Sequence, residues 1–148
     1  MVSRMVGKAI VLIFLMMGTV FDLKRKSVPN KYLYIWSVLT IVLVIIEIFK
    51  GKNVIDIILG VIPGIIFLFL AFVTREQIGF GDGWIIMLMG IFLGVNNVSK
   101  IIFVGFGILT LVSMTLLISR KAGKKTTIPF IPFLLMGFIA CGISGELL

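Results

Sequence analysis

Two aspartates are the residues of this sequence best placed to carry out chemistry. Asp22 follows the first apolar run of the chain, and Asp82 immediately precedes the fourth. An acidic side chain at the edge of an apolar membrane span is energetically unfavourable, so its presence suggests a function. If every apolar run crosses a membrane, both aspartates fall on the same face of it, which predicts that the two carboxyl groups work together.

A pair of neighbouring carboxyl groups can hydrolyse a peptide bond. The two groups cannot both ionise easily, so one keeps its proton while the other stays charged. The charged group accepts a proton from a water that attacks the peptide carbonyl, and the neutral group donates a proton to the carbonyl oxygen or to the leaving amine. Neither step requires histidine, serine, a metal or another cofactor, so we expect none. The sequence does not indicate which aspartate is the base.

The composition excludes several other chemistries. The chain has no histidine and one cysteine, Cys141. These counts exclude Ser-His-Asp and Cys-His catalysis, a disulfide within the chain and a cysteine-based zinc site. The formal net charge of +8 favours basic loops and contact with anionic lipid headgroups over nucleic-acid binding. No basic stripe is interleaved with aromatic residues.

Glycines surround Asp82 in the sequence GFGDG. Gly79, Gly81 and Gly83 are candidates for supporting a substrate, because glycine lets another backbone approach closely. Asp82 itself is expected at a helix N-terminus, which favours the charged form of a carboxyl group. Glu76, in the same connection, is either a further substrate-binding group or an ordinary loop charge.

Two residues after Asp22 are expected to shape the first connection. Pro29 prevents a helix from continuing through it, and Asn30 can cap the helix that follows. We therefore count both residues among the candidates that support the site.

The elements that position these residues are predicted to be membrane helices. Hydrophobic residues make up 60% of the 148-residue chain, and its mean hydropathy is +1.26, whereas soluble domains contain about 45–50% apolar residues. A span requires about 20 apolar residues. We predict an all-α, polytopic membrane protein that forms one domain over residues 1–148. Its six transmembrane helices are expected at 5–21, 32–49, 54–73, 83–95, 101–119 and 128–148.

The distribution of basic residues predicts the orientation. The first, third and fifth connections hold nine of the 14 Lys and Arg residues, which favours placing these connections in the cytoplasm. Asp22 and Asp82 would then face the cytoplasm from a multi-pass protein of the plasma membrane. We interpret the first run as a retained span, because a Lys/Arg cluster follows it instead of a small-residue cleavage site.

Three motifs in this order resemble the type IV prepilin peptidases, which are related to the preflagellin peptidases. The motifs are Asp22 with the segment VPN at 28–30, the GxGD segment GFGD at 79–82, and PFIPF at 129–133. The resemblance implies a six-helix membrane aspartic endopeptidase with Asp22 and Asp82 as its catalytic pair. It implies a prepilin-like precursor protein as partner, whose short basic leader is removed at the cytoplasmic face, typically after Gly.

The chain departs from the family in two ways. Many members have a lysine two residues after the GxGD aspartate, where this chain has Trp84. Larger members carry an extra cytoplasmic segment linked to methylation of the mature pilin, and nothing similar precedes the first run. The chain is therefore expected to be a peptidase without the methyltransferase module, close in size to the enzymes of tight-adherence pilus systems.

A different class of function remains open. In a small transporter, channel subunit or assembly scaffold, the two aspartates would be ligands for an ion or substrate, or helix caps. A carrier would more naturally hold its acids near the middle of the membrane. Intramembrane proteases of the presenilin type also use a GxGD aspartate, but they are much larger and their first aspartate lies inside a helix.

Overall fold

The computed structural model of the chain is a bundle of helices. It describes residues 2–25, 30–49, 51, 53–74, 79–119 and 128–143, and these contain helices and no strand, so the predicted all-α class is confirmed. The helices are α1 (Val2–Arg25), α2 (Asn30–Phe49), α3 (Val54–Val73), α4 (Phe80–Leu93), α5 (Val95–Ile118) and α6 (Ile131–Ile143).

Four of the six helices are long and apolar enough to cross a membrane, namely α1, α2, α3 and α5. Helices α4 and α6 have 14 and 13 residues, fewer than the roughly 20 that a span requires. Large apolar side chains face outward; Phe49, Phe103 and Ile143 are 87, 82 and 83% exposed. Such a surface suits lipid, so the structure supports a membrane protein with four candidate spans.

Helix α1 is longer than the sequence predicted. The polar connection was expected to begin at Asp22, but the helix continues to Arg25, because leucine, lysine and arginine are good helix formers. Asp22 therefore lies inside a helix, where its side chain is only 6% exposed. The expectation that it marks the boundary between span and connection was wrong.

Helix α5 begins six residues before its predicted start at residue 101. Its first residue, Val95, follows Gly94 directly, and the polar segment 96–100 is helical. Gly94 has a φ of 79°, a backbone conformation that glycine adopts readily. Its N–H donates to the Gly90 carbonyl at 2.8 Å, while its own carbonyl accepts from Val98 at 3.1 Å. One glycine therefore joins α4 to α5 without a loop.

Helices α3 and α4 approach each other through glycine backbones. A Cβ atom added to Gly90 would lie 1.8 Å from the Gly60 carbonyl oxygen, and one added to Gly64 would lie 2.4 Å from the Met87 Cα. Small residues at helix interfaces are typical of membrane proteins, where close van der Waals packing drives association. The helix that carries Asp82 is therefore held firmly along α3.

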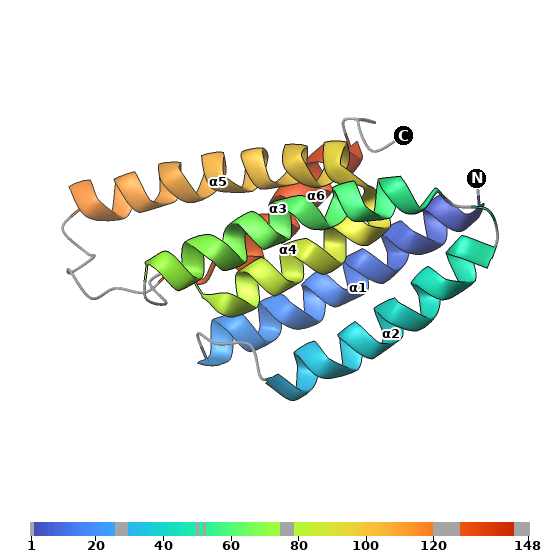
Figure 1. Cartoon of the computed structure of the whole chain (residues 1–148). Coiled ribbons are helices and arrows are strands. Elements are labelled where there is room, and N and C mark those ends of the chain that lie inside the picture. The colour runs from blue at the N-terminus through green and yellow to red at the C-terminus, as the bar shows by residue number, and fades with distance from the viewer. Residues whose placement is uncertain are drawn as a thin grey trace.

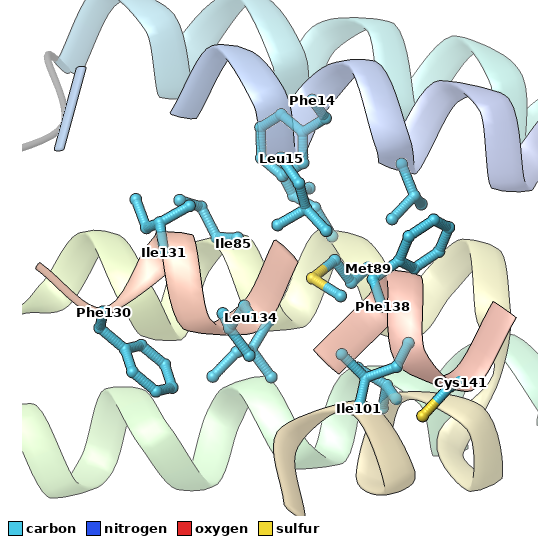
Figure 2. Packing of buried hydrophobic residues seen from close by; sticks show 14 of the residues in the cluster. Phe14, Leu15, Ile85, Met89, Ile101, Phe130, Ile131, Leu134, Phe138 and Cys141 are labelled. Carbon is cyan, nitrogen blue, oxygen red and sulfur yellow. The ribbon is translucent and has the colours of Figure 1, made fainter. Parts of the chain in front are cut away.

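The buried core lies mainly between α1, α4 and α6 (Figure 2). Leu15 of α1, Ile85 of α4 and Ile131 of α6 are at most 1% exposed. Helix α2 is joined to α1 through aromatic rings; the Phe14 ring lies 5.5 Å from Tyr32 and 4.9 Å from Trp36, centroid to centroid.

The bundle brings three helix ends together. The last turns of α1, the start of α4 and the start of α6 lie at the end of the bundle opposite the beginning of α1 (Figure 1). Because α1 ends there and α4 begins there, these two helices run antiparallel. Asp22 and Asp82 are consequently carried to the same end of the molecule.

The glycine contact between α3 and α4 can be tested by a single methyl group. We expect Gly90→Ala to lower the free energy of unfolding by about 1–3 kcal/mol, because the added Cβ forces the two backbones apart. Thermal unfolding of the detergent-solubilised protein measures the change. Gly107→Ala on α5 is the control, since a Cβ there meets nothing within 4 Å. Equal unfolding temperatures for the two variants would contradict the close contact.

Candidate active site

Asp22 links the end of α1 to the beginning of α6. Its Oδ2 accepts a hydrogen bond from the backbone N–H of Ile131 at 3.1 Å, and Ile131 is the first residue of α6. The first N–H groups of a helix have no partner within it, and a carboxylate satisfies them favourably. Asp22 thus caps a helix other than its own, and this bond fixes the position of its buried carboxyl group.

The segment PFIPF shapes the helix end that receives Asp22. The Phe130 carbonyl accepts from the N–H groups of Phe133 and Leu134 at 3.0 and 3.3 Å, which starts the helix. Pro132 has no N–H, so one of the unpaired donors of the first turn is absent. The Ile131 N–H is left for Asp22. Two segments of the sequence that resemble the peptidases therefore meet in space, which the sequence alone did not predict.

Asp82 lies in the first turn of α4, as predicted, and outside the four candidate spans. Its backbone N–H donates to the Gly79 carbonyl at 3.1 Å. Burial first, and then the negative charge of Asp22, raise the pKa of the Asp82 carboxyl from 3.8 to about 7. The two aspartates, from α1 and α4, are thus close enough for their charges to interact.

The three glycines around Asp82 have different surroundings. Gly79 is the N-cap residue of α4 and is exposed, and a Cβ there would lie 3.3 Å from the Asp82 Oδ2. Gly81 is half-buried within the helix. Gly83 is buried, and a Cβ there would lie 2.9 Å from the Leu68 backbone nitrogen of α3. Gly83 therefore permits helix packing, while Gly79 leaves space beside the carboxyl group.

The structure describes only some of the remaining site residues that the sequence predicted. Asn30 is the first residue of α2, but its side chain is not described. Pro29 and Glu76 lie outside the described residues. Among the residues that the structure describes, no group of three or more His, Cys, Asp or Glu side chains could hold a metal ion.

Trp84 anchors the start of α4 to α2. Its Nε1–H donates to the Ser37 Oγ at 2.8 Å, and the Ser37 hydroxyl donates to the Leu33 carbonyl at 2.6 Å. Trp84 is two residues after Asp82, so this bond helps to fix the turn that carries the carboxyl group. The indole thus gives this position a definite structural role, which the sequence did not reveal.

Asp22→Asn and Asp22→Ala separate the capping role of this residue from its charge. Asparagine keeps an oxygen that can accept from Ile131, whereas alanine leaves that N–H unpaired. We expect Asp22→Ala to be less stable than Asp22→Asn by about 0.5–2 kcal/mol, the usual effect of losing a cap. Chemical or thermal unfolding in detergent measures the difference. Identical stability of the two variants would show that the bond contributes nothing.

Asp82 should make the stability of the protein depend on pH. Because folding raises the pKa of this carboxyl from 3.8 to about 7, the folded state binds its proton more tightly than the unfolded state, and stability falls as pH rises between these values. Asp82→Asn cannot ionise, so it should exceed the wild type in unfolding temperature above pH 7, and the advantage should shrink toward pH 4. An advantage independent of pH would contradict the raised pKa.

Comparison with known proteins identifies a family. A family model described as the type IV leader peptidase family matches residues 9–145, a range that includes both aspartates and the segment 129–133. No curated protein and no solved structure matches the chain.

Proposed function

Because the chain belongs to the type IV leader peptidase family, we propose that Asp22 and Asp82 form the catalytic pair of a membrane aspartic endopeptidase. Its substrate is a prepilin-like precursor, and the reaction removes the short basic leader of that precursor at the cytoplasmic face of the plasma membrane. The observation that carries the proposal is the electrostatic interaction between two partly desolvated carboxyl groups from different helices.

The surroundings of the two carboxyl groups suggest separate roles. The hydrogen bond from Ile131 and the N-terminus of α6 stabilise negative charge on Asp22. Asp82, with its raised pKa, is the group that keeps the shared proton. Asp22 is then the general base and Asp82 the general acid, although a coupled pair titrates jointly.

The reaction proceeds in two steps under this assignment. Asp22 takes a proton from a water whose oxygen bonds to the peptide carbonyl carbon, while Asp82 gives its proton to the carbonyl oxygen. In the second step the carbon–nitrogen bond breaks, the proton on Asp22 passes to the leaving amine, and a hydroxyl of the intermediate returns a proton to Asp82. Both carboxyl groups end in their starting states, and no metal or cofactor takes part.

The membrane arrangement that suits this activity has six transmembrane segments, with Asp82 at the membrane surface, immediately before the fourth. Helices α4 and α6 are short but lie against longer neighbours, and their N-termini are at the end of the bundle where α1 ends (Figure 1). The distribution of Lys and Arg favours placing that end in the cytoplasm. The exposed apolar side chains contact lipid.

The activity we attribute to residues 1–148 is that of a peptidase, because the family match occupies 9–145. Of the supporting residues, Gly79 leaves space for a substrate backbone beside Asp82, and Gly83 lets α4 pack closely on α3. Gly81, Pro29, Asn30 and Glu76 remain proposed supporting residues.

The cap that Asp22 forms on α6 is also what a non-enzymatic membrane scaffold would show. Under that alternative the carboxyl group serves only the fold. Asparagine in its place would then preserve every function of the protein, whereas a peptidase would lose its base.

Cleavage of a prepilin-like precursor with a short basic leader tests the proposal. Co-expressed with the precursor in a bacterial membrane, Asp22→Asn and Asp82→Asn should each reduce cleavage by at least about a hundredfold, the usual effect of losing a general base or acid. Both variants should still insert and unfold cooperatively. Asp56→Asn, an exposed aspartate in the first turn of α3, is the control and should cleave normally.

Two outcomes would contradict the proposal in different ways. Substantial cleavage by either Asn variant would show that the Asp22–Asp82 pair is not catalytic. A wild-type protein that inserts but cleaves no such precursor would show that the substrate or the activity is wrong.

A further inference from the structure

Thr19 has a buried hydroxyl group without a hydrogen-bond partner in the described part of the chain. The other described threonines all donate to a backbone carbonyl of their own helix, as is common in helices: they are Thr40, Thr74, Thr110 and Thr115. An unpaired buried hydroxyl is unfavourable by about 1–3 kcal/mol, and such a group in a native structure requires an explanation, for example a catalytic role or a bound water or ion. Thr19 is therefore a group whose function the fold does not explain.

Thr19 lies on the face of α1 that carries Asp22. Leu15, Thr19 and Asp22 are spaced i, i+4 and i+7, which places them along one side of a helix. Leu15 is fully buried and Asp22 is 6% exposed. Leu15 points toward α4 and α6, on the side of Ile85 and Ile131 (Figure 2). The hydroxyl of Thr19 is thus directed toward the interior of the bundle, one turn from the Asp22 carboxyl group.

Thr19 and Asp82 both lie toward the same end of the bundle from the core residues Leu15 and Ile85. At about 1.5 Å per residue, Thr19 is about 6 Å from Leu15 toward the end of α1, and Asp82 is about 4.5 Å from Ile85 toward the start of α4. These displacements have the same direction because α1 and α4 run antiparallel (Figure 1). The Thr19 hydroxyl therefore lies one turn from Asp22, toward the end of the bundle at which α4 begins with Asp82 in its first turn.

We propose that Thr19 contacts the substrate, its Oγ–H donating a hydrogen bond to a carbonyl oxygen of the peptide bound at the Asp22–Asp82 pair. This inference rests on the proposed function. In the free protein the hydroxyl is desolvated and unpaired, so the bond to the peptide is formed without first breaking a bond within the protein. The residue then strengthens binding or positioning of the peptide and contributes nothing to the stability of the free protein.

Thr19→Val tests this directly, because valine has the shape of threonine without the hydroxyl. We expect the unfolding temperature of the purified variant to equal or exceed that of the wild type, while its kcat/KM for the precursor falls about tenfold, the effect of losing one hydrogen bond. Thr19→Ser, which keeps the hydroxyl, should recover most of the activity.

A matched control is available on α2. Thr40 is also buried, but its hydroxyl donates to the Trp36 carbonyl at 2.7 Å. Thr40→Val removes a hydroxyl of the same kind from a position where it is already paired. This variant should cleave the precursor as well as the wild type does, so any general effect of removing a buried hydroxyl is accounted for.

Three outcomes would overturn the inference. Normal cleavage by Thr19→Val would show that the hydroxyl does not contact the substrate. A lower unfolding temperature for Thr19→Val, restored by Thr19→Ser, would show that the hydroxyl serves the fold. A wild-type protein that shows no cleavage dependent on Asp22 and Asp82 would overturn the proposed function as well. This outcome differs from the first two because it is observed without any substitution at Thr19.

Discussion

The hydrogen bond from Ile131 to Asp22 joins residues 109 positions apart, and the arrangement of the site depends on it. A carboxyl group near the end of an apolar helix needs a partner when it is buried, and the first turn of another helix needs an acceptor. One bond satisfies both requirements. It also brings the end of α1 to the start of α6, beside the first turn of α4, where the second carboxyl group is located.

Backbone packing between glycines keeps the shorter helices in position around this bond. Helix α4 lies against α3 at Gly60 and Gly90, and α6 lies against α5 where a Cβ on Gly137 would be 2.6 Å from the Ile101 carbonyl oxygen. In lipid, where there is no hydrophobic drive between helices, such close contacts supply the attraction. Each short helix, α4 or α6, is thus fixed by a longer neighbour, so that the N-terminus of α4 and that of α6 are held at the same end of the bundle.

Much of this arrangement could be predicted from the sequence, and the misses have physical reasons. Apolar runs separated by short polar segments were sufficient to predict the helical fold class and the position of Asp82 in the first turn of α4. The partner of Asp22 could not be predicted, because every residue except proline has a backbone N–H. The identity of Ile131 therefore does not indicate that its N–H binds a carboxyl group. The unpaired hydroxyl of Thr19 could not be predicted for a similar reason. A threonine in an apolar helix usually donates a hydrogen bond to a backbone carbonyl of the same helix, and only the structure shows that Thr19 does not.

A cap and a catalytic base are compatible roles for the same carboxylate. A carboxylate can accept about four hydrogen bonds, so the bond from Ile131 to Oδ2 leaves capacity to accept a proton from water. The cap also supports the chemistry, because an N–H donor and a helix N-terminus stabilise the charged form that a base requires. The hydrogen bond from Ile131, which a purely structural residue would also form, is therefore the interaction that would make Asp22 the base and Asp82 the acid. The presence of a cap at Asp22 is no argument against catalysis.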